Sequence, residues 1–241
     1  MGGKTVTKTN IKVLYEDNHI IVIEKPVNIP SQADKSKDDD MLTIVKKYVK
    51  DKYEKPGDVY IGLVHRLDRP VGGIIVFART SKAASRLSEQ IRKREFEKGY
   101  LAVLNGTLLS AEGTLKHHIK KDTATNKVSI VAENTENAKK ALLHYTVLER
   151  AQGLSFVYIN LYTGRPHQIR AQFAAIGHAL YGDIKYGKPD KASQAQLALW
   201  SFEIGFEHPT KKQKLRFRSL PPFDKYPWNI FSTYAFVAFE N

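Results

Sequence analysis

The stretch that decides the fold reads Gly62-Leu63-Val64-His65-Arg66-Leu67-Asp68-Arg69-Pro70-Val71-Gly72-Gly73-Ile74-Ile75-Val76-Phe77. Its second half is rich in β-branched residues, which predicts a strand over residues 72–78. Pro70 and the glycine pair interrupt regular structure just after Asp68, so this carboxylate is presented from a constrained loop. Such a carboxylate can act as a nucleophile or a base while neighbouring arginines keep it ionised. The residues alone leave open a buried Asp–Arg pair that only orders the loop.

Outward from this stretch, the apolar pattern predicts many strands and few helices. Two short strands are expected within residues 11–25 around an Asp17-Asn18 turn, and further strands at 100–104, 114–119, 127–132, 141–149, 154–163, 197–206 and 213–218. Helices are expected at 41–52 with Asp40 as N-cap, from Ser81 as N-cap to about Arg94, and at about 166–176. Because strands dominate, an α+β fold with a mixed, largely antiparallel sheet and flanking helices is favoured over a doubly wound parallel sheet.

The composition excludes several classes of protein. The chain has 241 residues, of which 42% are hydrophobic, enough to bury a core and to exclude disorder for most of the chain. It contains no cysteine, which excludes disulfides, thiolate nucleophiles, iron–sulfur clusters and thiolate zinc sites. A phosphate-binding loop, a dinucleotide fingerprint and a His-Glu-x-x-His pair are all missing from the sequence. Nucleotide hydrolysis, nicotinamide redox chemistry and zinc proteolysis therefore lose most of their support.

The charge points to a polyanionic partner. The chain carries 38 Lys and Arg against 25 Asp and Glu, a formal net charge of +13, so RNA or DNA leads the expected partners. A solvated basic surface without a partner is the open alternative. Basic residues cluster in 86–94 and 211–218, the expected nucleic-acid contacts by charge alone. An apolar signal segment and a run of ~20 apolar residues are both lacking, so we expect a cytoplasmic protein with no membrane partner.

Four ordered motifs resemble one enzyme family. His65-Arg66-Leu67-Asp68, followed by a glycine-rich turn and an apolar strand, is similar to the central motif of the RluA-type pseudouridine synthases, which isomerise uridine to pseudouridine in ribosomal or transfer RNA. The other motifs are Asp17–Pro26, Lys98–Val103, and Thr163–Arg170 continued by Gly177–Asp183. The resemblance spans roughly residues 11 to 222 and is highly specific because the motifs keep a family-like order and spacing. It implies the family's catalytic fold, with an active-site cleft across the sheet.

The resemblance also implies roles for single residues. Asp68 falls on the catalytic aspartate, which attacks the target nucleoside or begins glycosidic cleavage, and Arg165 falls on the arginine that pairs with it. Tyr100 falls on the tyrosine that packs against the base and has been proposed to assist proton removal. Arg66 matches the residue that helps to hold the nucleotide flipped out of the RNA stack, and Leu199 matches an apolar pocket position. The remaining expected substrate-binding residues are His65, His167 and Arg170.

The implied reaction and two departures from the family complete this interpretation. Isomerisation breaks the bond from sugar to base nitrogen and rejoins the base through carbon without redox change, so neither cofactor nor metal is expected. The target must be flipped out of folded RNA, which costs a few kcal/mol that backbone contacts offset. Trp200 stands where the family often has His, and Pro70-Val71-Gly72-Gly73 stands where many members carry a Thr-Ser-Gly turn. The departure at Pro70-Val71-Gly72-Gly73 leaves Asp68 in register.

The expected organisation is a flexible tail over residues 1–10, a catalytic domain over 11–225, and an apolar C-terminal extension over 226–241 that packs on the body. A monomer without an obligatory protein partner is expected. Two alternatives remain open: a non-catalytic RNA chaperone or ribosome-assembly factor on the same fold, and a hydrolase in which Asp68 activates water and releases free uracil.

Overall fold

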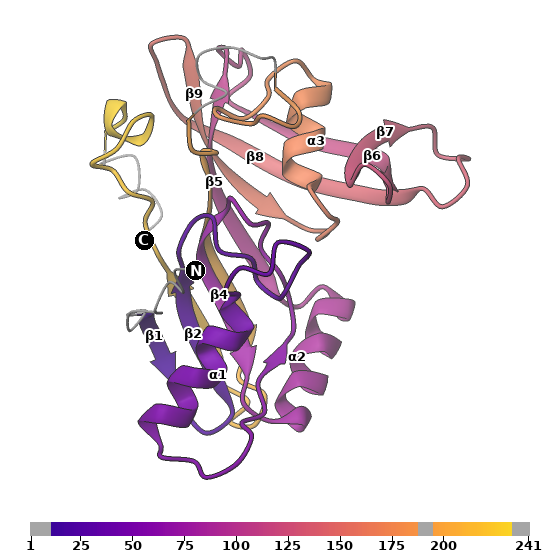
Figure 1. Cartoon of the computed structure of the whole chain (residues 1–241). Coiled ribbons are helices and arrows are strands. Elements are labelled where there is room, and N and C mark those ends of the chain that lie inside the picture. The colour runs from indigo at the N-terminus through magenta and orange to yellow at the C-terminus, as the bar shows by residue number, and fades with distance from the viewer. Residues whose placement is uncertain (1–10, 188–194, 233–241) are drawn as a thin grey trace, which may run out of the picture.

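The computed structural model describes residues 11–187 and 195–232 (Figure 1). The strands are β1 (Lys12–Glu16), β2 (Ile20–Lys25), β3 (Gly62–Leu63), β4 (Gly72–Ala78), β5 (Glu97–Asn105), β6 (Glu112–Asp122), β7 (Lys127–Val131), β8 (Lys139–Ala151), β9 (Leu154–Leu161), β10 (Leu199–Glu207) and β11 (Lys214–Arg218). The helices are α1 (Met41–Lys52), α2 (Ser81–Lys93), α3 (Gln168–Ala175) and the short 3-10 helix η2 (Trp228–Ile230). Among the described residues, no helix is both long enough and apolar enough to cross a bilayer.

The strands form one continuous sheet that runs through two lobes (Figure 1). Their order is β1-β2-β4-β10-β5-β9-β8-β6-β7, with β11 paired to β10 and β3 paired to β4. Every pairing between these named strands is antiparallel except that of β4 with β10. The predicted α+β fold with a mixed, largely antiparallel sheet and flanking helices is therefore confirmed.

Both faces of the N-terminal part of the sheet are covered because β4 is apolar on both sides. Successive side chains of a strand point to opposite faces. Phe77 packs in the same cluster as Val45 of α1, whereas Val76 packs in the cluster that contains Leu87 of α2. The helices α1 and α2 thus cover opposite faces of β4, which explains why all its residues are buried.

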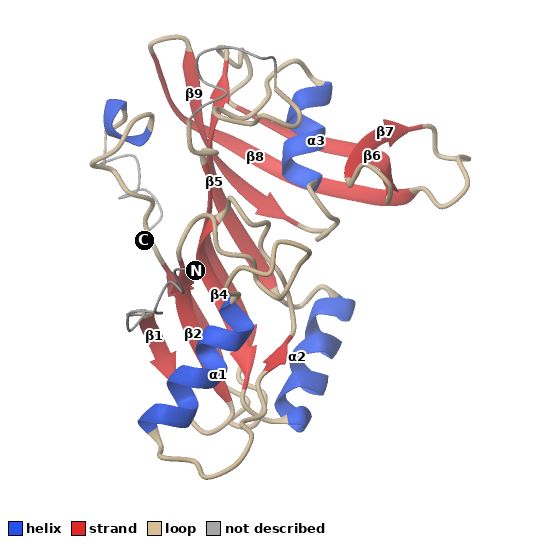
Figure 2. Cartoon of the chain, viewed as in Figure 1, coloured by secondary structure: helices blue, strands red, loops and turns tan. Residues whose placement is uncertain are grey.

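The other lobe carries α3 on the same face as α1 (Figure 2). Phe173 of α3 packs against Tyr145 of β8, with ring centroids 5.4 Å apart. The opposite face of the central strands is covered by the chain after β11, where Trp228 and Phe231 pack on Phe156 of β9. The expected tail 1–10 and the last part of the expected extension, 233–241, lie outside the described residues, so the predicted domain boundaries stay a prediction.

Local sequence patterns predicted the ends of most helices and strands to within a few residues. The Asp40 carboxylate accepts a hydrogen bond from the Thr43 N–H (3.1 Å) and caps α1, as predicted. The predicted cap of α2 was wrong by one position, because the Thr80 hydroxyl, not Ser81, accepts from the Ala83 N–H (3.1 Å) while Thr80 keeps extended backbone angles. The strands β5, β6 and β8 run further than predicted, into charged residues that an apolar pattern does not reveal.

Candidate active site

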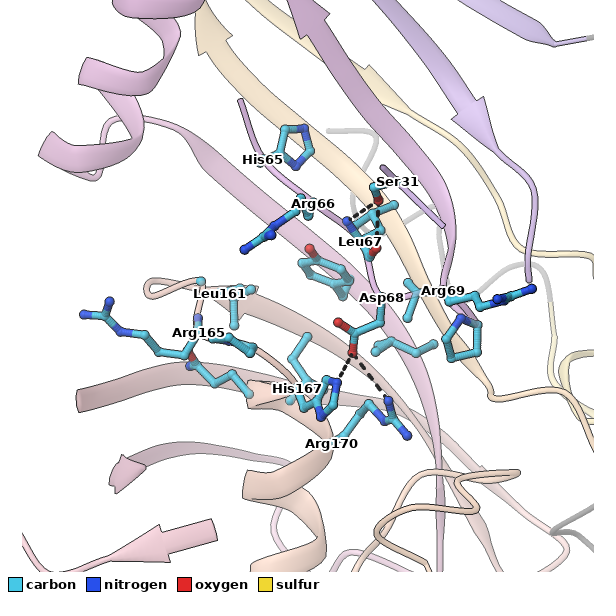
Figure 3. A pocket seen from close by; sticks show the side chains of 18 of the residues that line it. Ser31, His65, Arg66, Leu67, Asp68, Arg69, Leu161, Arg165, His167 and Arg170 are labelled. Carbon is cyan, nitrogen blue, oxygen red and sulfur yellow. Dashed lines mark hydrogen bonds and ion pairs between the residues drawn. The ribbon is translucent and has the colours of Figure 1, made fainter. Parts of the chain in front are cut away.

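An open cleft of about 1290 Å³ lies on the face of the sheet that carries α1 and α3 (Figure 3). Its apolar floor is made by Tyr100 of β5, Leu161 of β9 and Leu199 of β10, three adjacent strands. All eight residues expected from the sequence line this cleft: His65, Arg66, Asp68, Tyr100, Arg165, His167, Arg170 and Leu199. Segments far apart in the sequence therefore meet at one site, and the polar groups stand around an apolar base.

The loop that carries Asp68 is fixed on both sides of that residue. The Ser31 hydroxyl donates to the Leu67 carbonyl oxygen (2.8 Å) and accepts from the Leu67 N–H (3.0 Å). On the other side, the Lys25 ammonium donates to the Arg69 carbonyl oxygen (3.2 Å). The Asp68 carbonyl then accepts from the Val71 N–H (2.9 Å), which closes a turn before β4. These contacts hold the Asp68 side chain, 29% exposed, at the edge of the cleft.

Lys25 lies entirely buried at the end of β2. Its ammonium also donates to the carbonyl oxygens of Pro26 (2.9 Å) and Ile29 (2.6 Å), so all three of its protons have an acceptor. Burial lowers the pKa of Lys25 to about 7, although the nearby Asp68 charge opposes that change. Lys25 thus ties the loop that carries Asp68 to the segment after β2.

The cationic partner of Asp68 is Arg170. Its Nη1 lies 3.4 Å from Asp68 Oδ2, while its Nε and Nη2 each donate to the Asp183 carboxylate at 2.7 Å. Burial opposes the charge of Arg170, but the hydrogen bonds to Asp183 outweigh burial and raise the pKa of this guanidinium above its ordinary value. A permanent cation therefore lies beside the Asp68 carboxylate.

Arg165 was expected to pair with Asp68, but the structure pairs Arg165 with a different group. Arg165 precedes α3, and its Nε donates to the Lys140 carbonyl oxygen (3.3 Å). Figure 3 shows Arg165 turned away from Asp68, whereas Arg170, within the first turn of α3, points toward it. Arg165 lies three residues before this helix begins at Gln168.

His167 completes the polar wall beside Asp68. Its Nε2 lies 3.9 Å from Asp68 Oδ2, and its Nδ1 lies 2.8 Å from the Tyr186 hydroxyl. That hydroxyl also accepts from the Val128 N–H (2.8 Å), so it links His167 to β7. Burial lowers the pKa of His167, partly offset by Asp68. His167 also has a left-handed backbone (φ 49°), which turns the chain into α3.

Tyr100 is buried, and burial raises the pKa of its phenol, to which the Asp68 charge adds. The phenol therefore stays protonated at neutral pH and offers an aromatic face and a neutral O–H group, not a phenolate. Leu199, 4% exposed, extends the same apolar floor. These two residues form the part of the cleft suited to a flat base.

His65 and Arg66 lie at the entrance of the loop. His65 Nε2 accepts from the Val76 N–H of β4 (3.1 Å), and its ring packs against Phe96 with centroids 5.3 Å apart. Burial and the charge of Lys98 lower the pKa of His65 to about 3, so the ring is neutral. Arg66 is exposed and its guanidinium lies beside the cleft (Figure 3).

The two departures from the family pattern meet each other in space. Gly72 and Trp200 are register partners in the parallel pair of β4 and β10. A methyl group on Gly72 would lie 2.2 Å from Trp200 Cζ3, so the glycine leaves the room that the indole occupies. Gly73 has a left-handed backbone (φ 108°) against the Ser201 backbone, which also requires glycine. Both changes lie below Asp68 and leave its loop in place.

Sequence reasoning assigned no role to Lys25, Ser31, Lys98, Asp183 or Tyr186, which the structure places in or directly behind the cleft. Lys25, Lys98 and Asp183 stand inside the motifs that carry the family resemblance, and this position was the available signal. Ser31 and Tyr186 had none. Within the described ranges, no three His, Asp or Glu side chains gather into a set that could ligate a metal ion.

Comparison with known proteins defines the class of protein. Residues 19–175 match the family model for RNA pseudouridylate synthases, so the chain belongs to that family. Its relatives place it more narrowly among the RluA-type enzymes. A ribosomal large subunit pseudouridine synthase D from Pseudomonas aeruginosa is 31% identical over 229 residues, which cover 89% of this chain and 69% of that protein.

Two further proteins are similar over most of the chain. An uncharacterised RNA pseudouridine synthase from Aquifex aeolicus is 31% identical over 225 residues, which cover 88% of this chain and 70% of the relative. The structure of human RNA pseudouridylate synthase domain containing 1 aligns with a TM-score of 0.73 at 24% identity and covers 91% of this chain and 87% of that one. This likeness confirms the pseudouridine synthase fold.

Proposed function

We propose that this protein isomerises uridine to pseudouridine in the RNA of the large ribosomal subunit, with Asp68 as the group that starts the reaction. Membership of the RNA pseudouridylate synthase family supports the reaction. The names of several relatives, ribosomal large subunit pseudouridine synthases C and D, support the choice of RNA. The observation that carries the assignment of Asp68 is its position at the cleft, fixed by Ser31 and Lys25 and 3.4 Å from Arg170.

The chemistry follows from the geometry. A uridine flipped into the cleft would lie on Tyr100 and Leu199, with its glycosidic bond near Asp68. The bond from C1′ to N1 breaks, the base turns, and a bond from C1′ to C5 forms, while C5 loses a proton and N1 gains one. Arg170 places a positive charge beside the Asp68 carboxylate for the first step, and the protonated Tyr100 supplies a stacking face worth about 1–3 kcal/mol per base.

Contacts to the RNA backbone would offset the cost of flipping. Arg92 and Arg94, at the end of α2, line the cleft and fit this role. In the other basic segment, Arg216 and Arg218 form ion pairs with Glu203, and none of its residues lines the cleft. We therefore assign the RNA path to the α2 side of the cleft.

We also propose that the protein acts as a monomer in the cytoplasm, without an obligatory protein partner. The ribosomal RNA named for several relatives supports the cytoplasm as the compartment.

The decisive test uses the purified protein and transcribed large-subunit ribosomal RNA, with position-resolved mapping of pseudouridine. The wild type and the matched control Asp58→Asn, which changes an exposed carboxylate outside the cleft, should both form pseudouridine at the same position. Asp68→Ala should form none and still bind the RNA.

Three results would contradict the proposal. An active Asp68→Ala protein would remove the catalytic role of this carboxylate. Release of free uracil, with a matching loss of RNA mass in mass spectrometry, would identify a base-removing hydrolase. If the Asp68→Ala variant keeps the cellular role of the protein, the non-catalytic assembly factor would be the better description.

A further inference from the structure

One wall of the cleft carries positive charges that the mechanism above does not use. Lys98 lies on β5 two residues before Tyr100, so both side chains point from the same face of the strand into the cleft. A methyl group on Gly164 would lie 3.0 Å from Lys98 Nζ, so the ammonium lies directly against the loop that carries Arg165. Figure 3 shows the guanidinium groups of Arg165 and Arg66 on the same side of the cleft.

These cations lack an acidic partner. Within residues 11–187 and 195–232, no carboxylate oxygen lies within 4.0 Å of the charged groups of Lys98, Arg165 or Arg66. By contrast, Arg170 in the same cleft is bound to two carboxylates. Burial lowers the pKa of Lys98, and repulsion from Arg165 adds to this effect. The free protein therefore holds two mutually repelling cations together, one of them largely withdrawn from water.

We propose that Lys98 and Arg165 together bind one backbone phosphate of the RNA, next to the nucleotide that is flipped toward Asp68. This inference rests on the proposed function and names the subsite that anchors its substrate. A planar guanidinium and a compact ammonium both bind phosphate in proteins. The repulsion between them is relieved when an anion lies between them, so their cost in the free protein is recovered on binding.

The arrangement also separates two negative charges. Arg170 neutralises Asp68 on one wall, and Lys98 with Arg165 would neutralise the phosphate on the other. Arg165 is turned away from Asp68 (Figure 3), so the phosphate would be held away from the carboxylate that must approach the sugar. The subsite therefore fixes where the nucleotide enters without competing for Asp68.

The test measures binding of a fluorescent single-stranded oligouridylate by anisotropy over a series of KCl concentrations. Each phosphate neutralised on a single strand contributes about 0.7 to the slope of log K against log salt. Lys98→Met and Arg165→Met should each lower this slope. Because both side chains share one phosphate, the double variant should lose about 0.7 in total and not twice that amount. Lys98→Arg should keep the wild-type slope.

A matched control separates the subsite from general charge. Lys47→Met removes an equal charge from the exposed face of α1, outside the cleft, and should leave the slope unchanged. Thermal unfolding provides the second readout: Lys98→Met should unfold at the same temperature as the wild type or higher, because it removes a poorly hydrated ammonium without a partner. A lysine with a structural role would instead lower that temperature.

Three results would overturn the inference: a wild-type slope in Lys98→Met, a loss of about 1.4 in the slope of the double variant, or wild-type protein whose binding of oligouridylate does not depend on salt. These results are independent of catalysis. If the slopes behave as expected but no RNA gains pseudouridine, the phosphate subsite stands and the proposed function fails. If pseudouridine forms but the slopes do not change, the function stands and the subsite fails.

Discussion

Replacing Arg170 with methionine should destabilise the protein strongly, because the change leaves the buried Asp183 carboxylate without a cationic partner. The side chains of Arg170 and Asp183 are 7% and 0% exposed, and two hydrogen bonds of 2.7 Å join them. Charge-assisted hydrogen bonds contribute about 1.5–3 kcal/mol each, and breaking a buried ion pair costs about 3–5 kcal/mol. We expect Arg170→Met to lower the free energy of unfolding by about 3–5 kcal/mol in urea titrations at pH 7.

A second substitution separates stability from catalysis. Asp183→Asn keeps an oxygen that can accept from the N–H groups of Lys185 (3.0 Å) and Tyr186 (3.1 Å), but it removes the buried charge. The double variant, Arg170→Met with Asp183→Asn, should recover most of the lost stability. It should still have a lower kcat than the wild type in a pseudouridine-formation assay, because Asp68 has lost its cation.

Two outcomes would refute this reasoning. A loss below about 1 kcal/mol in Arg170→Met would show that the pair behaves like an exposed salt bridge. A double variant with wild-type kcat would show that Asp68 does not depend on Arg170. For a chain of this size, 1 kcal/mol corresponds to about 2–4 °C in Tm, so thermal unfolding provides an independent check.

Three further predictions follow from the packing around the loop. Burial lowers the pKa of His65 from 6.5 to about 3, so between these pH values the unfolded state binds more protons than the folded state. The free energy of unfolding should therefore fall as the pH falls, by up to about 1.4 kcal/mol per pH unit. The variant His65→Gln can still accept from the Val76 N–H, and in urea titrations at pH 4 to 7 it should reduce this pH dependence by about that amount. Ser31→Ala leaves the buried N–H and carbonyl oxygen of Leu67 unpaired, so the free energy of unfolding should fall by about 1–3 kcal/mol. In the activity assay, kcat should fall by a larger factor than KM rises. Unchanged kinetics would show that the hydrogen bonds between Ser31 and Leu67 do not position Asp68. Gly72→Ser should lower the free energy of unfolding by about 1–3 kcal/mol, because the new side chain overlaps Trp200. In a Trp200→His background, this loss should be smaller by about 1 kcal/mol or more. If the effects of the two substitutions are strictly additive, the contact between these residues does not explain the loss.

Local sequence signals predicted the elements better than their arrangement. The run from Gly72 to Ala78 combines β-branched residues with flanking breakers, and Met41–Lys52 combines helical spacing with an acidic cap, so both ranges were predicted closely. No local pattern reveals that β10 pairs with both β4 and β5, because these partners lie far from it in the sequence. The order of strands follows from the packing of the whole sheet.

The candidate site, too, was predicted only in part. The family-like motifs brought all eight expected residues to one cleft. Which arginine contacts Asp68 was not predictable from them, since Arg165 and Arg170 stand in one motif and the turn at His167 decides which of them faces the loop. Ser31 was invisible because a serine in a polar loop has no distinguishing pattern until Leu67 is placed beside it.

The position of β10 has a consequence for the synthesis of this protein. A nascent chain that ends before Leu199 already contains β4 and β5, but the strand that joins them is missing, and each presents an unpaired edge. Leu199 itself belongs to the floor beneath the flipped base. We therefore expect a chain that ends before Leu199 to modify no RNA and to expose two strand edges that promote aggregation.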